Sequence, residues 1–153
     1  MIKSYLDRMF SMEGKVCLVT GASRGIGHGI AEAFHKAGAV VYGIGRTPAD
    51  TIETKWNYIA CDVTDKQELL MLLKRVYDDG HNLNVLVNAA GVTAAVEPGG
   101  AITNFRYTLE TNLIAVYTCC VEVLPFMRFS GGGSIINITS IGSTLGFPGN
   151  PSY

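Results

Sequence analysis

A glycine-rich segment between a short apolar run and an amphipathic stretch constrains this fold more than any other feature. The run Val16–Thr20 leads into residues 21–27, GASRGIG, whose glycines have the spacing GxxxGxG. A helical pattern follows directly and stops at Gly38. A strand, a glycine turn and a helix N-terminus in this order suit a dinucleotide. Glycine lets the backbone approach a pyrophosphate, and the free N–H groups of the helix attract anions.

Apolar runs and helical patterns keep alternating along the chain. Further strands are expected at Val40–Ile44, Trp56–Cys61, Asn84–Val87 and Ser134–Thr139. Between them, Thr64 and Gln67 give a capping-box signal for one helix. The alternation predicts an α/β protein of the Rossmann type. Its doubly wound parallel sheet should have the strand order 3-2-1-4-5 in the portion present, with the remaining strands missing.

The longest helical pattern covers Phe105–Phe129, and Pro125 is expected to kink or fray its end. Its apolar stripe is predicted to contain Leu109, Leu113, Val116, Cys120 and Leu124. The stretch Ser140–Tyr153 is rich in glycine and proline and is expected to be loop.

Composition limits the class of protein and its partners. We expect an N-terminal lead at residues 1–13 and an NAD(P)-binding Rossmann domain, incomplete at its C-terminus, at residues 14–153. A net charge of −1 offers no basic field for nucleic acid or anionic membrane, and no run of eighteen apolar residues indicates a transmembrane helix. The four cysteines lack CxxC or Cys/His metal spacing. We therefore expect reduced thiols, a cytoplasmic protein and no metal.

Two arginines near the glycine turn bear on the choice of cofactor. Arg46 ends the second predicted strand, where an acidic residue would accept hydrogen bonds from the adenosine ribose of NAD. A guanidinium there pairs instead with a 2′-phosphate, and Arg24 adds a second positive charge. This favours NADP, with NAD as the alternative. The simpler interpretation is that both arginines are merely solvated.

Two further strand ends carry polar residues. Asp62 and Val63 follow the third predicted strand, where they either contact adenine or, for Asp62, help to begin the next helix near Thr64. Asn88 follows the fourth strand and either ties neighbouring strand ends together or is an ordinary turn residue. In the first case, the small residues behind Asn88 leave room for a cofactor.

These features together resemble the short-chain dehydrogenase/reductase family. The resemblance rests on the segments Thr20–Gly27, Asn88–Gly91 and Gly133–Ser140, and on Asn112 in the long helix. Tyr153 also stands thirteen positions after Ser140, as the family requires. The match covers about residues 14–153. One small departure is Ala89, where many members carry a second asparagine.

The resemblance implies a site for a nicotinamide cofactor at the glycine turn and the following strand ends. Its predicted cofactor-binding residues are Gly21, Ser23, Arg24, Gly25, Ile26, Gly27, Arg46, Asp62, Val63, Asn88, Ala89, Ala90 and Gly91. Tyr153 would be the general acid for reduction and the base for oxidation. Ser140 would polarise the substrate carbonyl, so both residues would contact substrate. Asn112 would hold a water in the proton relay.

The same resemblance implies an oxidoreductase for a small-molecule ketone or secondary alcohol, such as a 3-oxoacyl or sugar-acid substrate. The complete protein is expected to be a homodimer or homotetramer. The family places a lysine four positions after the tyrosine, where its ammonium group lowers the tyrosine pKa from about 10 toward neutrality. We therefore expect a longer polypeptide, with an intact mass above 16.4 kDa. The alternatives are a non-catalytic NADP-binding module and an inactive fragment.

Overall fold

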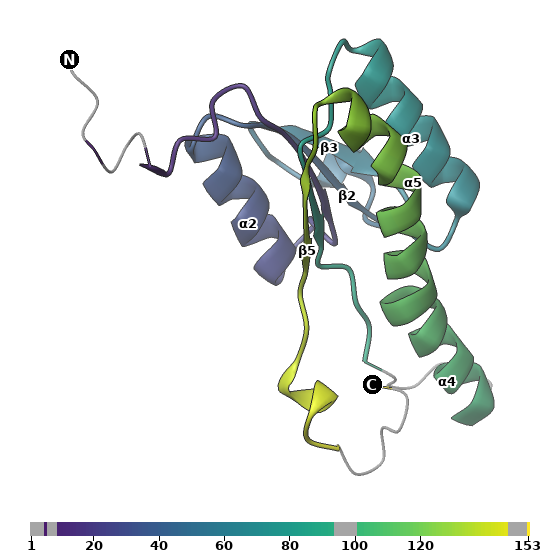
Figure 1. The fold of residues 1–153 in the computed structure, drawn as a ribbon. Helices are drawn as coiled ribbons and strands as arrows, with labels where there is room; N and C mark the ends of the chain where they lie inside the picture. The colour runs from purple at the N-terminus through teal and green to yellow at the C-terminus, as the bar shows by residue number, and fades with distance from the viewer. Residues whose placement is uncertain (1–4, 6–8, 94–100, 147–152) are drawn as a thin grey trace.

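The fold is a parallel sheet covered by helices on both faces (Figure 1). The computed structural model describes residue 5 and residues 9–93, 101–146 and 153. The strands are β1 (Val16–Thr20), β2 (Val40–Gly45), β3 (Asn57–Ala60), β4 (Val85–Asn88) and β5 (Ser134–Asn137). They pair in parallel in the order β3-β2-β1-β4-β5, which confirms the predicted doubly wound topology.

Helix α2 lies on one face of the sheet, and α3 and α5 lie on the other (Figure 1). The helices are α2 (Gly25–Lys36), α3 (Lys66–Asp78), α4 (Ala101–Leu109) and α5 (Ala115–Phe129). A π-helical turn at Glu110–Ile114 joins α4 to α5, so residues 101–129 form one continuous helix. Short 3₁₀ turns occur at Ala49–Thr51 and Ile141–Ser143, the second within the stretch expected to be loop.

The core lies on both sides of β1, all five residues of which are buried. On the side of α3 and α5 it includes Leu18, Ile44, Leu69, Leu73, Leu86 and Val123. On the side of α2 it includes Cys17, Val19, Ala31, Val41, Trp56 and Val87. Burial on both faces explains why β1 is a continuous apolar run rather than an alternating one. It also fixes the carboxyl ends of β1 and β4, where the site lies.

The start of α3 differs from the sequence prediction. The N-cap is Asp65, whose Oδ1 accepts hydrogen bonds from the backbone N–H groups of Gln67 (2.8 Å) and Glu68 (3.2 Å). The predicted capping box at Thr64 and Gln67 is therefore wrong by one residue. The reason is local competition, because the carboxylate of Asp62 accepts bonds from the N–H and the hydroxyl of Thr64.

The apolar stripe predicted for the long helix is wrong in part, because only Cys120 of its five residues packs against the core. The buried positions of the helix are Thr108, Thr111, Ala115, Cys119, Val123 and Met127. Leu113 and Leu124 instead leave 57% and 41% of their surface exposed. The inward face carries mostly small or polar residues, so a search for large apolar side chains selects the outward face. Pro125 lies inside α5, and the helix continues past it to Phe129.

The sheet has an exposed edge at β5. Ile136 and the following Ile138 leave 40% and 39% of their surface exposed, and β5 is the last strand in the observed order. Helix α2 packs against β1 and β2.

The helix Ala101–Phe129 alone, among the described residues, is long and apolar enough to cross a membrane, with a mean hydropathy of 1.3. This finding differs from the sequence-based expectation, but it is weak support for a membrane span. Its α5 portion packs against β4 and α3 and contributes Cys119 and Val123 to the core. Only 22% of the apolar window is buried within the described structure.

Candidate active site

The glycine turn brings three segments into close contact at the carboxyl edge of the sheet. Gly21 (φ +67°) follows β1, and a Cβ atom there would lie 2.7 Å from the backbone of Ala89 and Ala90. A Cβ atom on Gly27 would lie 2.4 Å from the carbonyl oxygen of Gly21. Gly25 also has a positive φ, of 60°, but open space around it. Close approach of the backbone therefore requires glycine at positions 21 and 27, and a positive φ favours glycine at positions 21 and 25.

The N-terminus of α2 is open to an anion. Its N-cap residue, Arg24, makes no side-chain hydrogen bond to the helix, and the first turn contains no acidic residue. The first N–H groups of a helix have no partner within the helix, and the dipole there is positive. This end of α2 therefore offers donors to a negatively charged group.

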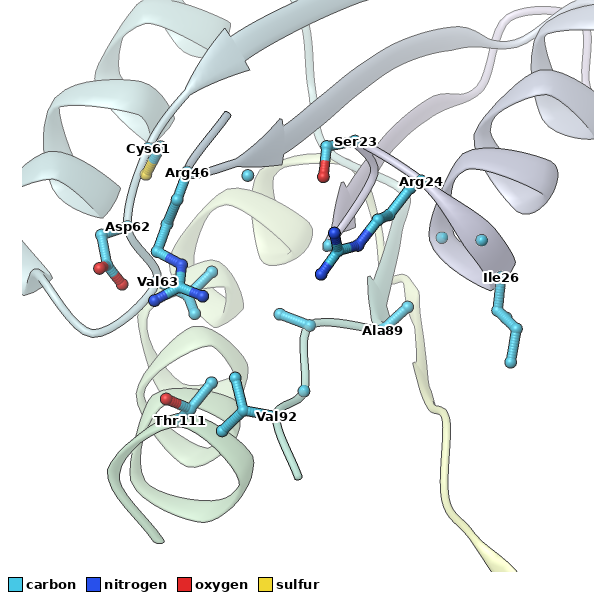
Figure 2. A pocket seen from close by; sticks show the side chains of 16 residues that line it. Ser23, Arg24, Ile26, Arg46, Cys61, Asp62, Val63, Ala89, Val92 and Thr111 are labelled. Carbon is cyan, nitrogen blue, oxygen red and sulfur yellow. The ribbon is translucent and has the colours of Figure 1, made fainter. Parts of the chain in front are cut away.

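A cavity of about 310 Å³ lies in front of this turn (Figure 2). Twelve of the thirteen predicted cofactor-binding residues line it: Gly21, Ser23, Arg24, Gly25, Ile26, Gly27, Arg46, Asp62, Val63, Ala89, Ala90 and Gly91. The lining residues that the sequence prediction missed are Gly45, Cys61, Val92 and Thr111. Gly45 and Cys61 adjoin predicted residues, whereas Thr111 comes from the inward helix face that the apolar pattern did not indicate.

Two guanidinium groups face this cavity (Figure 2). Arg24 comes from the glycine turn, and Arg46 comes from the end of β2. Within the described part of the chain, neither forms a salt bridge with a carboxylate. Arg46 instead donates a hydrogen bond to the hydroxyl of Tyr107. The cavity thus carries a concentration of positive charge that its own acidic groups do not pair.

Asp62 has the helix-entry role considered from the sequence, and its contact with adenine stays a prediction. Its Oδ1 accepts hydrogen bonds from the N–H (3.0 Å) and the hydroxyl (2.9 Å) of Thr64 ahead of α3. The residue also lines the cavity beside Val63. One carboxylate oxygen therefore shapes the turn into the helix, and the residue still borders the space for a ligand.

Asn88 ties the ends of two strands together, as one of the two sequence interpretations expects. It leaves only 3% of its surface exposed, and its Nδ2 donates to Oδ1 of Asn137 at the end of β5 (2.8 Å). Thr20 makes a second tie, which sequence reasoning missed. Its hydroxyl oxygen accepts from the N–H groups of Ala89 (3.1 Å) and Ala90 (3.0 Å). These bonds fix the cavity wall formed by residues 89–91.

A second cavity, of about 790 Å³, adjoins the first and shares Arg24, Arg46 and residues 89–92 with it. The three predicted catalytic residues, Ser140, Tyr153 and Asn112, all line it, and so does Asn88. Ser140 Oγ accepts a hydrogen bond from the N–H of Gly142 (3.1 Å). Its own O–H therefore remains able to donate to a ligand.

Asn112 holds the wall between the two cavities. Its Oδ1 accepts from the N–H of Val92 (2.8 Å), and its Nδ2 donates to the carbonyl oxygen of Val92 (2.8 Å). Both polar atoms of the side chain are thus engaged with one residue of the wall. Sequence reasoning selected Asn112 but not this contact, and the predicted role in holding a relay water stays a prediction.

The fold defines a Rossmann-type α/β domain with its cavities at the carboxyl ends of the parallel strands. Aldohexose dehydrogenase of Thermoplasma acidophilum has a similar fold, with a TM-score of 0.84 and 30% identity. The comparison covers 92% of this chain and 55% of that one. The sequence profile of the short chain dehydrogenases matches residues 15–153. The chain belongs to the short-chain dehydrogenase family.

Curated relatives carry several different substrate names. The chain is 33% identical to 3-ketodihydrosphingosine reductase of Bacteroides thetaiotaomicron, over 90% of this chain and 51% of that protein. It is also 33% identical to 3-oxoacyl-(acyl-carrier-protein) reductase of Haemophilus influenzae, over 93% of this chain and 62% of that protein. The chain therefore spans between half and two thirds of the length of these relatives.

Proposed function

We propose that the protein is an NADP(H)-preferring oxidoreductase that interconverts a ketone and a secondary alcohol. The observation that carries this proposal is the adjoining pair of cavities. One is lined by the glycine turn and two arginines, and the other by Ser140 and Tyr153. A cofactor lying across the shared wall at residues 89–92 would reach from the first cavity into the second.

The first cavity fits the adenosine and pyrophosphate of a dinucleotide. Gly21 and Gly25 would let the backbone approach the pyrophosphate, and the N-terminus of α2 would donate hydrogen bonds to it. Asp62 and Val63 would border the adenine. Arg24 and Arg46 would face a 2′-phosphate, the group that distinguishes NADP from NAD. Its negative charge would pair with the two guanidinium groups, which have no carboxylate partner among the described residues.

In the second cavity, Ser140 would hold the substrate by its carbonyl oxygen. The N–H of Gly142 already occupies a lone pair of Ser140 Oγ, and the hydroxyl hydrogen is left to be donated to a ligand. Tyr153 would give its phenolic proton to the same carbonyl oxygen during reduction and recover it during oxidation. The reduced nicotinamide supplies hydride to the carbonyl carbon when it is bound.

Asn112 would support this chemistry in two ways. Its bonds to Val92 hold the wall along which the cofactor would lie. The family resemblance adds a relay role, in which a water near Asn112 would return protons to Tyr153. The substrate class proposed is a 3-oxoacyl, sugar-acid or similar carbonyl compound, and the names of the relatives support that range.

The decisive experiment measures NADPH oxidation with a panel of 3-oxoacyl thioesters and keto sugars. Ser140→Ala and Tyr153→Phe are each expected to lower kcat by at least about 100-fold, the lower end of what acid–base groups contribute. Binding of NADPH, followed by its fluorescence, should stay within a few-fold of the parent protein. Full turnover in both variants would overturn the assignment. NADPH binding without turnover of any carbonyl would favour a cofactor-binding module.

We further propose that copies of this chain associate through the outward face of the long helix and that the protein is cytoplasmic. Leu113, Tyr117, Val121 and Leu124 lie on this face, and each leaves at least 40% of its surface exposed. Unburied apolar side chains at such spacing favour association. Sedimentation velocity of the parent protein and of Leu124→Glu tests this, with a dimer or tetramer expected to dissociate in the variant. The four free cysteines support a reducing compartment.

A further inference from the structure

The side chain of Arg46 is held at the mouth of the first cavity by a residue from a distant helix. Its Nη1 donates a 2.5 Å hydrogen bond to the hydroxyl of Tyr107, and its guanidinium carbon lies 5.8 Å from the centre of the Tyr107 ring. Tyr107 is half-buried in α4, and Arg46 follows β2. The contact therefore joins a strand end to a helix on the far side of the cavity.

We propose that Tyr107 is a positioning residue that sets the preference for a 2′-phosphate over a 2′-hydroxyl, by holding Arg46 ready to bind the phosphate. The inference rests on the proposed use of NADP(H). Tyr107 lies outside the glycine turn and the strand ends, and no motif in the sequence indicates it. Tyr107 need not touch the cofactor, because it acts through Arg46.

Arg46 has enough N–H donors to bind Tyr107 and a phosphate at the same time. A guanidinium has five N–H donors, and the bond to Tyr107 uses one of them, so the remaining donors suffice for a bidentate bond to phosphate. The tyrosine is a neutral acceptor, so it leaves the positive charge of Arg46 unpaired. A carboxylate at position 107 would cancel that charge and compete with the phosphate.

The benefit of the contact is conformational. An exposed arginine side chain loses rotamer entropy when it binds an anion. Tyr107 restricts Arg46 before the ligand arrives, through the hydrogen bond at its hydroxyl. Less entropy is then lost on binding of the phosphate. Ligands without a 2′-phosphate gain nothing from this restriction, so the contact should alter the preference and not the general affinity.

The test uses two nucleotides that report only on the adenosine end, adenosine 2′,5′-bisphosphate and adenosine 5′-monophosphate. Their dissociation constants are measured by calorimetry for the parent protein, Tyr107→Phe, Arg46→Ala and the double variant. Tyr107→Phe removes the hydroxyl and keeps the ring. Tyr77→Phe is the matched control, because Tyr77 lies on α3, leaves 54% of its surface exposed and lines neither cavity.

We expect Tyr107→Phe to reduce the preference for the bisphosphate about fivefold, the effect of one hydrogen bond, with binding of the monophosphate unchanged. Arg46→Ala should reduce the preference by at least about tenfold, since it removes a charge-assisted contact. In the Arg46→Ala background, Tyr107→Phe should have no further effect. Tyr77→Phe should match the parent protein throughout.

The outcomes separate two failures. If Arg46→Ala leaves the preference unchanged, the proposed recognition of NADP(H) by Arg46 is wrong. If Arg46→Ala lowers the preference but Tyr107→Phe leaves it unchanged or raises it, only the role of Tyr107 is wrong. A rise would mean that Tyr107 competes with the phosphate for Arg46. Equal additional effects of Tyr107→Phe with and without Arg46 would also overturn the inference.

Discussion

Asn88 and Asn137 join the ends of β4 and β5 through a 2.8 Å hydrogen bond from Nδ2 of the first to Oδ1 of the second. Asn88 is buried, and β5 is the edge strand of the sheet. The bond therefore anchors the strand that leads to Ser140.

Replacement of Asn88 by alanine is expected to lower the free energy of unfolding by about 1 kcal/mol, the usual value of a hydrogen bond with modest loss of packing. Asn82→Ala is the control, because Asn82 is exposed and should change stability by less than about 0.5 kcal/mol. Urea unfolding followed by circular dichroism measures both. Equal stability of the two variants would contradict the anchoring role.

Gly21→Ala is expected to damage both the fold and the first cavity. The new Cβ atom would lie 2.7 Å from the backbone of Ala89 and Ala90, at a φ of +67°. The conformation alone costs about 1–3 kcal/mol, and the contact adds to this. Gly29→Ala is the control, since it lies within α2 and a Cβ atom there meets nothing within 4 Å. That variant should gain about 0.5–1 kcal/mol. Thermal unfolding with and without NADPH would show a lower Tm for Gly21→Ala and a higher Tm for Gly29→Ala.

Stability at alkaline pH should depend on Tyr42. Burial, together with a hydrogen bond to Asp79, raises the Tyr42 pKa from 10.0 to about 12. The folded state thus holds this proton more tightly than the unfolded state. Its contribution is fully present below pH 10 and is lost as the pH rises toward 12. Denaturant unfolding between these values should show a steeper loss for the parent protein than for Tyr42→Phe.

The buried thiols of Cys17, Cys61 and Cys119 act in the same direction, because burial raises the pKa of each. Both proteins contain these thiols, so the difference between their free energies of unfolding at each pH reports on Tyr42 alone. Identical pH profiles for the two proteins would contradict the prediction.

The four cysteines should differ in reactivity. Burial raises the thiol pKa of Cys17 and Cys119 to about 12 and that of Cys61 to about 11. Cys120 is only half-buried. Iodoacetamide at pH 8 should therefore modify Cys120 first, at a rate at least about tenfold above the others. Peptide mass spectrometry gives the order, and earlier modification of Cys17 would show that the core opens readily.

Most of the fold and of the first cavity could be predicted from the sequence, because both depend on local patterns. The glycine turn at Gly21, Gly25 and Gly27 is a short-range signal, and the strand order follows from the alternation of strands and helices. The contact of Arg46 with Tyr107 joins residues 61 positions apart. No local pattern specifies which side chain meets a guanidinium across a cavity.

The inward face of the long helix escaped prediction for a different reason. Thr111 and Ala115 are buried there, while Leu113 is exposed, so hydrophobicity points to the wrong face. Small side chains allow a helix to lie close to the sheet, and their value comes from shape rather than apolar area. The bonds between Asn112 and Val92 depend on that close approach.

The continuous helix from Ala101 to Phe129 links the two ends of the site mechanically. Tyr107 contacts Arg46 and, five residues later, Asn112 contacts Val92. Each residue of an α-helix turns the next by about 100°, so one residue inserted or deleted between them would swing one anchor away from its partner. The π-helical turn at Glu110–Ile114 overlaps this interval and contributes to their relative rotation. The number of residues between Tyr107 and Asn112 therefore fixes how far apart their two contacts lie. A substitution within this interval should disturb the site much less than an insertion or a deletion.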